Sequence, residues 1–363
     1  MATWADWHAS IVTGERRDVR ARIARLLLAL AAGPYALAVT LRNLLYDWGW
    51  LRCQRAACPV ISVGNLTVGG TGKTPAVEFI ARRLRQQECR VAILSRGYGA
   101  TSGRNDEALV LEENLPDVPH LQGADRVELA RIAVEELEAE LLLLDDGFQH
   151  RRLHRDLNIA LIDATCPWGH GWVLPRGWLR EPRRALRRAD LILLTRCDQV
   201  DEAERARLYR DVTRLAPGRP IVESQHAAEV LCNANGAELS VAALRGQMVA
   251  AFCGLGRPQA FFRQLEQLGA RVAAQRTFPD HHPYSREDVA ELERWARHLP
   301  REAWLLTSQK DLVKLRIATL ADRPLWALRI QLRLTAQEAD FERCLSPFLP
   351  EDVHGRQPSL SAL

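Results

Sequence analysis

The stretch VISVGNLTVGGTGKTP, residues 60–75, decides the fold class of this chain. Its apolar start predicts a buried strand, its glycines predict a turn, and the lysine, threonine and proline at its end predict the start of a helix. This order is typical of a phosphate-binding loop, in which backbone N–H groups and a helix N-terminus surround phosphate oxygens. The strict pattern G-x-x-x-x-G-K-[ST] requires glycine where this chain has Thr67, so we expect a variant of the loop.

The loop predicts an ATP site with Mg²⁺. Lys73 is expected to bridge the β- and γ-phosphates, and the Thr74 hydroxyl to bind the metal. Lysine is rare here, since all but three of the 49 lysine and arginine residues are arginines. A compact ammonium fits such a loop, whereas a guanidinium fork does not. The residues expected to bind nucleotide are Gly69, Gly70, Thr71, Gly72, Lys73 and Thr74.

Alternating apolar runs and helical patterns follow from about residue 59 and predict an α/β P-loop NTPase core with a doubly wound parallel sheet. The expected strands are 60–63, 91–94, 141–144, 157–162 and 191–194, with helices at 74–86 and 125–139. A second set predicts a smaller α/β domain, with strands near 220–223, 248–253, 271–277, 304–307 and 325–333 and helices at 258–268 and 285–298. The predicted organisation is an N-terminal helical segment (1–50), the core domain (51–220), the smaller domain (221–340) and a tail (341–363).

The N-terminal segment permits two interpretations. Five arginines between residues 16 and 25 precede the uncharged run 26–41, which is shorter than the roughly 20 residues that span a bilayer. Gly33-Pro34 is expected to interrupt the run, and Tyr46, Trp48 and Trp50 follow it. The segment is either a helical hairpin packed on the protein or an interfacial anchor whose arginines contact anionic headgroups.

Composition limits the partners of the chain. A net charge of +4 over 363 residues gives no reason to expect nucleic acid as a partner, and no obligate protein partner is indicated. The eight cysteines are scattered without zinc-site spacing, which favours reduced thiols. No cleavable signal peptide is apparent.

Two adjacent acids predict where the metal binds. Asp145 and Asp146 follow four leucines directly, at the end of an expected strand. Adjacent carboxylates are costly without a cation, so a magnesium site is the functional interpretation, and a solvated turn is the alternative.

Several further motifs occur in one order along the chain: SRGYG (95–99), DE (106–107), LLDDGFQHRRLHRDLNIALIDA (143–164), LPRGWLREPRRALRRAD (175–190) and FPDHHPYS (278–285). With the glycine loop, they resemble the tetraacyldisaccharide 4′-kinase family, the lipid A 4′-kinases of Gram-negative bacteria, from the N-terminal helical segment to about residue 335. The resemblance implies transfer of the ATP γ-phosphate to the 4′-hydroxyl of an acylated disaccharide 1-phosphate lipid, giving lipid IVA. It also implies a peripheral or monotopic protein on the cytoplasmic face of the bacterial inner membrane, which favours the interfacial anchor.

The resemblance implies further site residues. Asp106 matches the catalytic base and His281 its partner, although Asp106 alone reads as a solvated loop acid and His281 as a surface histidine. Glu107 matches a magnesium ligand beside Thr74 and one of Asp145 and Asp146. Positions matched to the acceptor substrate are Arg96, Tyr98, His150, Arg176 and Arg180. The chain departs from the family pattern at His170, Trp178 and Gln309, which puts local acceptor contacts in doubt.

Two questions remain open at this point. The nine arginines between residues 151 and 188 either hold phosphate groups or, for 183–188, form a solvated helix face. A P-loop ATPase or GTPase that drives a partner or metal delivery is the alternative function. A membrane-bound scaffold with a dead nucleotide site would be expected to lack Lys73 or both acids, and all three are present.

Overall fold

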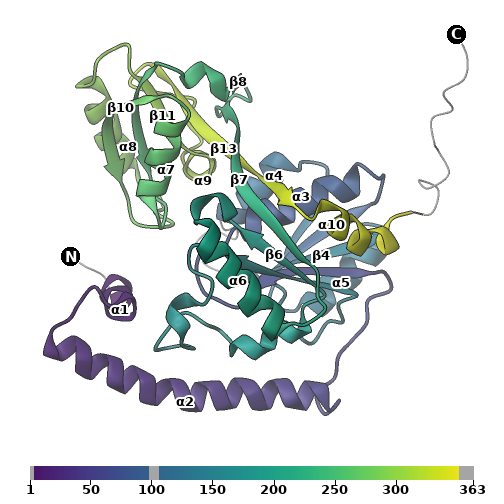
Figure 1. Ribbon diagram of the computed structural model, residues 1–363. Coiled ribbons are helices and arrows are strands. Elements are labelled where there is room, and N and C mark those ends of the chain that lie inside the picture. The colour runs from purple at the N-terminus through teal and green to yellow at the C-terminus, as the bar shows by residue number, and fades with distance from the viewer. Residues whose placement is uncertain (1–3, 98–105, 351–363) are drawn as a thin grey trace, which may run out of the picture. The chain divides into compact units, whose positions relative to one another are not determined.

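The computed structural model describes residues 4–97 and 106–350, with side chains from residue 7, and its chain folds as two compact units (Figure 1). Unit 1 comprises the chain up to Arg96, Val118–Gln225 and the chain from Arg333 onward; unit 2 comprises Gly97–Asp117 and His226–Leu332. The chain passes from unit 1 into unit 2 within β7 (Ile221–Cys232) and returns within β13 (Arg323–Ala336). These bounds differ from the predicted domains, because residues 97–117 belong to unit 2 and the segment after residue 332 belongs to unit 1.

The sheet of unit 1 is parallel, with the strand order β7-β6-β5-β1-β4-β2-β3. Its other strands are β1 (Val60–Asn65), β2 (Val91–Ser95), β3 (His120–Gln122), β4 (Leu141–Asp145), β5 (Leu157–Asp163) and β6 (Leu191–Thr195). Every residue of β1, β2, β4, β5 and β6 is buried, as expected for parallel strands covered on both faces. The predicted doubly wound α/β core is confirmed.

The helices of unit 1 that pack on this sheet are α3 (Lys73–Arg85), α5 (Arg126–Glu135) and α6 (Glu202–Leu215), and α10 (Glu338–Leu345) contacts α3. Short 3₁₀ helices lie at Gly169–Gly171, Arg183–Arg188, Cys197–Gln199 and Ser346–Phe348. The pattern at 125–139 predicted a helix that ends four residues too late, and α6 and α10 were not predicted. Phe341 of α10 is fully buried, its ring centroid 5.5 Å from that of Phe79, so residues predicted to form a tail pack on this unit.

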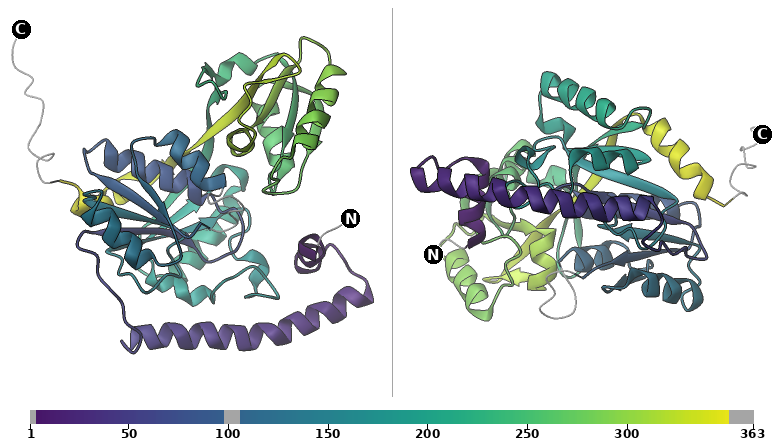
Figure 2. Two further views of the ribbon diagram at one scale, coloured as in Figure 1. Left: turned by 180° about the vertical axis from the view of Figure 1, so that it is seen from behind. Right: turned by 90° about the horizontal axis from the view of Figure 1, so that it is seen from below.

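Helix α2 (Val19–Asp47) follows the shorter α1 (Trp4–Thr13) and runs without interruption for 29 residues (Figure 2). The predicted break at Gly33-Pro34 is therefore wrong. Both residues are exposed, and the helix continues through them on either side. The helix is long and apolar enough to cross a membrane by length and composition, and many of its leucines are exposed.

Unit 2 has a parallel sheet in the order β10-β9-β11-β13, made of β9 (Met248–Cys253), β10 (Arg271–Thr277), β11 (Trp304–Ser308) and β13. Two short strands pair antiparallel: β8 (Glu238–Ser240) with β7 and β12 (Thr319–Leu320) with β13. The helices are α4 (Asp106–Asn114), α7 (Pro258–Gln267), α8 (Arg286–Arg297), α9 (Gln309–Leu315) and a 3₁₀ turn at Val241–Leu244. One core lies under α7 around Phe262, and the other lies under α8 and α9 around Phe252.

Candidate functional site

The glycine loop joins the end of β1 to the start of α3. Gly72 caps the helix with φ at +87°, a backbone conformation that glycine adopts without strain. The Asn65 side-chain amide donates to the Thr67 carbonyl at 2.7 Å, and the Thr195 hydroxyl donates to the Thr71 carbonyl at 2.9 Å. Thr67 itself forms a bridge with Leu179, which accounts for an extended threonine where the strict pattern has glycine. These contacts fix the backbone of the loop, which is a variant of the strict pattern, as predicted.

Lys73, Asp146 and Arg180 come together at this loop. The Lys73 Nζ lies 3.7 Å from Asp146 Oδ1 and 3.4 Å from Asn65 Oδ1. One guanidinium nitrogen of Arg180 donates to both Asp146 oxygens, at 2.7 and 2.8 Å. Burial alone would raise the pKa of Asp146, but the charges of Lys73 and Arg180 hold that pKa below its usual value. Asp146 is therefore a carboxylate that faces the loop lysine.

The oxygen atoms around the loop are of the chemical kind that Mg²⁺ binds. β4 pairs with β1 so that Asp145 lies beside Val63, and Asp145 and Thr74 are buried next to the loop. Gly147 permits this close approach, because a Cβ there would lie 2.5 Å from the Ser62 Oγ. Within residues 4–97 and 106–350, no group of three or more His, Cys, Asp or Glu residues could hold a metal ion. Kinases hold Mg²⁺ through one or two carboxylates together with substrate phosphates, and Asp145 and Asp146 supply carboxylates at this loop. The magnesium ligands remain a prediction.

Two arginines that the sequence analysis missed also belong to this region. Arg196, directly after β6, donates to the Gly70 carbonyl at 2.8 Å and forms an ion pair with Asp163. Arg126 is buried at the start of α5 and donates to the Asp145 carbonyl at 3.5 Å. Arg196 stands at the carboxyl end of a parallel strand, where ligand sites of such sheets lie, and this position was the available signal.

The residues that the family resemblance matches to the acceptor substrate have different surroundings in the structure. Arg180 contacts Asp146, as described above. The His150 Nδ1 lies 3.5 Å from an Arg126 nitrogen, and burial together with the Arg126 charge lowers the pKa of His150 to about 4. Arg176 lies over the Trp172 ring at 5.8 Å. Arg96 follows β2 and is exposed, whereas Tyr98 lies outside the described residues. Their roles in binding an acceptor remain predictions.

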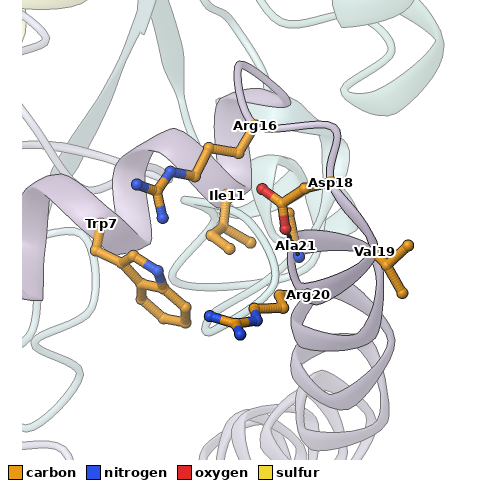
Figure 3. A pocket seen from close by; sticks show the side chains of 7 residues that line it. All are labelled: Trp7, Ile11, Arg16, Asp18, Val19, Arg20 and Ala21. Carbon is orange, nitrogen blue, oxygen red and sulfur yellow. Dashed lines mark hydrogen bonds between the residues drawn. The ribbon is translucent and has the colours of Figure 1, made fainter.

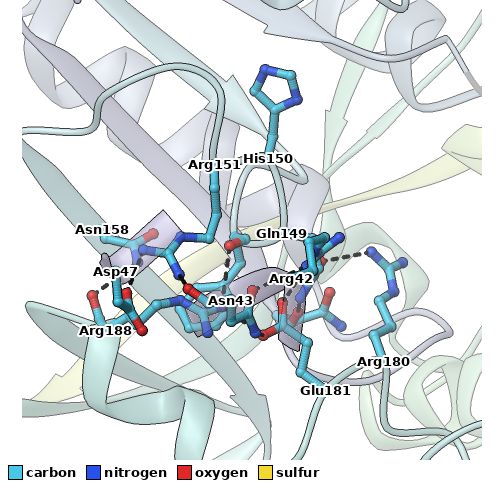
Figure 4. Close-up of polar contacts among 12 residues, drawn as sticks. Arg42, Asn43, Asp47, Gln149, His150, Arg151, Asn158, Arg180, Glu181 and Arg188 are labelled. Carbon is cyan, nitrogen blue, oxygen red and sulfur yellow. Dashed lines mark hydrogen bonds and ion pairs between the residues drawn. The ribbon is translucent and has the colours of Figure 1, made fainter. Parts of the chain in front are cut away.

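A buried ionic cluster joins α2 to the segment that contains Arg180 (Figure 4). Glu181 is fully buried, and its carboxylate accepts a hydrogen bond from the Asn43 amide at 2.7 Å and pairs with Arg188 at 2.8 Å. Arg151 donates to the Asn43 carbonyl at 2.9 Å and pairs with Asp47 at 2.7 Å. Arg151 therefore holds α2 directly and Arg188 holds it through Glu181, so residues 183–188 are not simply a solvated helix face.

A second polar contact joins α2 to this segment, where the Tyr35 hydroxyl donates to the Arg180 carbonyl at 2.9 Å. Because Arg180 also binds Asp146, a single residue, Arg180, links α2 to the carboxylate at the phosphate loop.

A hollow of about 620 Å³ lies where α1 meets α2 (Figure 3). The side chains of Trp7, Arg16 and Arg20 surround it with those of Ile11 and Asp18. Asp18 is turned to the start of α2, where it accepts a hydrogen bond from the Ala21 N–H at 2.9 Å. The hollow between the N-terminal helices is therefore lined by more positively charged side chains than negatively charged ones.

In unit 2, Asp106 and Glu107 begin α4 and face basic side chains. The His281 Nδ1–H donates to Asp106 Oδ2 at 3.1 Å, and Lys314 lies 3.1 Å from the same oxygen. Burial would raise the pKa of Asp106, but the hydrogen bond from His281 and the charge of Lys314 lower it. The same hydrogen bond raises the pKa of His281. The structure thus brings the predicted Asp–His pair into contact and places Asp106 in the first turn of a helix instead of a loop.

Glu107 is paired with Lys310, whose Nζ lies 2.8 Å from its Oε1. Sequence reasoning missed Lys310 and Lys314, although the signal was present: they are the only lysines besides the one in the phosphate loop. Gln309, where the chain departs from the family pattern, exchanges two hydrogen bonds with the Asn114 amide, at 2.7 and 3.2 Å. This exchange fastens the far end of α4 to α9.

With this geometry in hand, the comparisons with known proteins decide the family. Residues 24–349 match the family model described as tetraacyldisaccharide-1-P 4′-kinase. This chain belongs to that kinase family. A tetraacyldisaccharide 4′-kinase of Anaeromyxobacter dehalogenans is 47% identical over 321 residues, which cover 83% of this chain and 84% of the relative. Another, from Syntrophus aciditrophicus, is 38% identical over 351 residues, or 90% of this chain and 93% of the relative.

A solved structure supports the same assignment for the tetraacyldisaccharide-1-P 4′-kinase family. The crystal structure of LpxK from Aquifex aeolicus in complex with ATP is 32% identical to this chain, with a TM-score of 0.73, and the match covers 90% of this chain and all of that one. The resemblance inferred from the motifs is confirmed. The hollow between α1 and α2 is built from residues that precede the segment matched by the family model.

Proposed function

We propose that this protein is an ATP-dependent kinase that phosphorylates the 4′-hydroxyl of a tetraacylated disaccharide 1-phosphate, giving lipid IVA in lipid A biosynthesis. The observation that carries the proposal is the family match over residues 24–349 in a chain whose phosphate loop keeps Lys73 beside Asp146. The ATP in the related crystal structure supports ATP as the phosphoryl donor.

Unit 1 supplies the groups for the nucleotide. In this assignment the backbone of residues 69–72 holds the phosphates, and Lys73 binds the β- and γ-phosphate oxygens in place of its contact with Asp146. Thr74, Asp145 and Asp146 would hold Mg²⁺, with Glu107 as the further ligand that the family pattern suggests. When bound, Mg²⁺ neutralises charge on the transferred phosphoryl group.

Unit 2 supplies the groups for the acceptor proton. The acceptor oxygen forms a bond to the γ-phosphorus while its proton passes to the Asp106 carboxylate, and the bond from that phosphorus to the bridging oxygen breaks so that ADP leaves with the electron pair. His281, which donates to Asp106, holds the carboxylate and shares the charge change. The acceptor contacts assigned to Arg96, Tyr98, His150, Arg176 and Arg180 are part of this proposal.

We place the enzyme on the cytoplasmic face of the inner membrane as a peripheral or monotopic protein. The support is the exposed apolar surface of α2, where for example Leu26, Leu30 and Leu37 are each more than 60% exposed. The lipid substrate has acyl chains in the same bilayer, so an anchor there brings the enzyme to its acceptor.

The experiment that tests the function uses purified full-length protein in detergent. With radiolabelled ATP, Mg²⁺ and the tetraacyl disaccharide 1-phosphate, thin-layer chromatography is expected to show label transferred to the lipid. ATP turnover that is equal with and without the lipid, and no labelled lipid, would instead assign the hydrolytic ATPase or GTPase.

A further inference from the structure

Lys314, on α9, is built into unit 2 in an unusual way. Its Nζ lies 3.1 Å from Asp106 Oδ2 and 3.4 Å from Asp311 Oδ1, and its side chain is only 8% exposed. Elsewhere in the chain nearly every lysine or arginine position is an arginine. A compact ammonium fits between two carboxylates where a planar fork would need more room. The choice of lysine here therefore points to a geometric requirement.

Buried groups of unit 2 hold the ammonium of Lys314 in position. Asp311 is fully buried, and its carboxylate accepts hydrogen bonds from the Gly254 N–H at 3.1 Å and the Ser308 hydroxyl at 2.6 Å. The Lys314 Nζ also lies 5.3 Å from the centre of the Tyr284 ring. Because these groups belong to the sheet, its loops and α9, Lys314 presents a charge at a set position to α4.

The contacts of Asp106 with the described residues all go to one of its two oxygens. The His281 Nδ1–H and the Lys314 ammonium both lie 3.1 Å from Oδ2. No described residue hydrogen-bonds or ion-pairs with Oδ1. A carboxylate held by one oxygen at the start of a helix has little freedom to rotate, and its second oxygen stays available for an incoming hydroxyl.

We propose that Lys314 is a positioning residue for the phosphoryl transfer: anchored by Asp311, it holds Asp106 through Oδ2 so that Oδ1 receives the acceptor proton. This inference rests on the proposed kinase function. In this step Lys314 acts only through its contact with Asp106.

The test compares kcat for lipid phosphorylation in single and double variants of the full-length protein. Lys314→Met is expected to lower kcat at least tenfold while the KM for ATP changes less than twofold. In the Asp106→Asn background, Lys314→Met is expected to cause no further loss, because the group it positions is already gone. Lys314→Arg is expected to recover little of the lost kcat, because a planar guanidinium needs more room than the ammonium between the two carboxylates.

Gln309→Ala is the matched control, because it breaks the link between α9 and Asn114 on α4 without touching Asp106. It is expected to keep kcat within twofold of the unaltered protein. If Lys314→Met does not fold, Lys314→Met with Asp311→Asn removes both members of the buried pair and is expected to show the same kcat loss.

Three results would overturn the inference: a kcat within twofold in Lys314→Met, losses that multiply in the double variant with Asp106→Asn, or an equal kcat loss in Gln309→Ala. The failure of the proposed function is separate, since the unaltered protein would then not label the lipid at all.

Discussion

Lys73 is the only lysine in unit 1, and its ammonium faces Asp146 across the phosphate loop. Lys73→Ala is expected to lower kcat at least about 100-fold, because preorganised charge on the transferred group is lost. Lys73→Arg is expected to stay nearly inactive, since a guanidinium fork does not fit the loop. Kinase assays on protein with an unchanged circular dichroism spectrum test both, and Arg85→Ala on the same helix serves as the active control. An active Lys73→Ala would remove the nucleotide site from this loop.

His150 gives the stability of unit 1 a defined dependence on pH. Its folded pKa of about 4 is below the usual histidine value of about 6.5, so between these values the unfolded chain binds more protons. The contribution of a neutral His150 is therefore present above about pH 6.5 and is lost as the pH falls toward 4. His150→Gln is expected to lose less stability than the unaltered protein between about pH 7 and about pH 5 in urea unfolding. Equal losses would contradict the burial of a neutral imidazole.

At the scale of elements, the buried cluster around Glu181 fastens α2 to unit 1. Asn43→Ala removes the 2.7 Å hydrogen bond to that carboxylate and is expected to lower the free energy of unfolding by about 1–3 kcal/mol. Thr40→Ala, on the same helix, loses only an exposed contact with Arg184 and is expected to cost less than about 0.5 kcal/mol. Urea unfolding measures both. A cost for Asn43→Ala as small as that of Thr40→Ala would show that the cluster does not hold the helix.

The buried strands were the elements most accessible from sequence, because a continuous apolar run between turn residues has few alternatives. The run at 248–253 matches β9, whereas β7 and β13 extend beyond their predicted ends into partly exposed residues. Helices α4 and α9 were missed because each is short and owes its place to tertiary contacts. The break expected at Gly33-Pro34 also failed, because the proline removes one backbone hydrogen bond and the 29-residue helix continues on both sides of it.

At the scale of the whole molecule, the parts of the candidate site that lie within one local motif could be predicted from the sequence. The glycine loop could be derived from residues 60–75, and Asp145 and Asp146 from their place at a strand end. The Asp106–His281 pair could not, because 175 positions separate its members and neither residue is unusual in its local sequence. Only the family resemblance suggested it. Lys314 is a further example: the sequence shows that lysine is rare in this chain, but it does not show that Lys314 contacts Asp106.

Membrane association belongs to the molecule as a whole, and the structure changes how it can be tested. Deleting residues 1–45 would remove Asn43 from the buried Glu181 cluster, so a loss of binding could reflect a damaged fold. Substitutions on the exposed face of α2 avoid this. Leu30 and Leu37 are 65% and 69% exposed, so replacing them changes few contacts inside the protein.

The variant Leu30→Glu with Leu37→Glu is expected to shift the protein from the membrane pellet to the supernatant at least about tenfold, because each leucine contributes about 2 kcal/mol when buried in lipid. The thermal unfolding midpoint is expected to stay unchanged. Leu137→Glu, at another exposed leucine, is the matched control and is expected to pellet like the unaltered protein. If the double variant still pellets with liposomes or membranes as the control does, a surface other than α2 makes the attachment, and kinase activity on lipid vesicles would then be independent of this face.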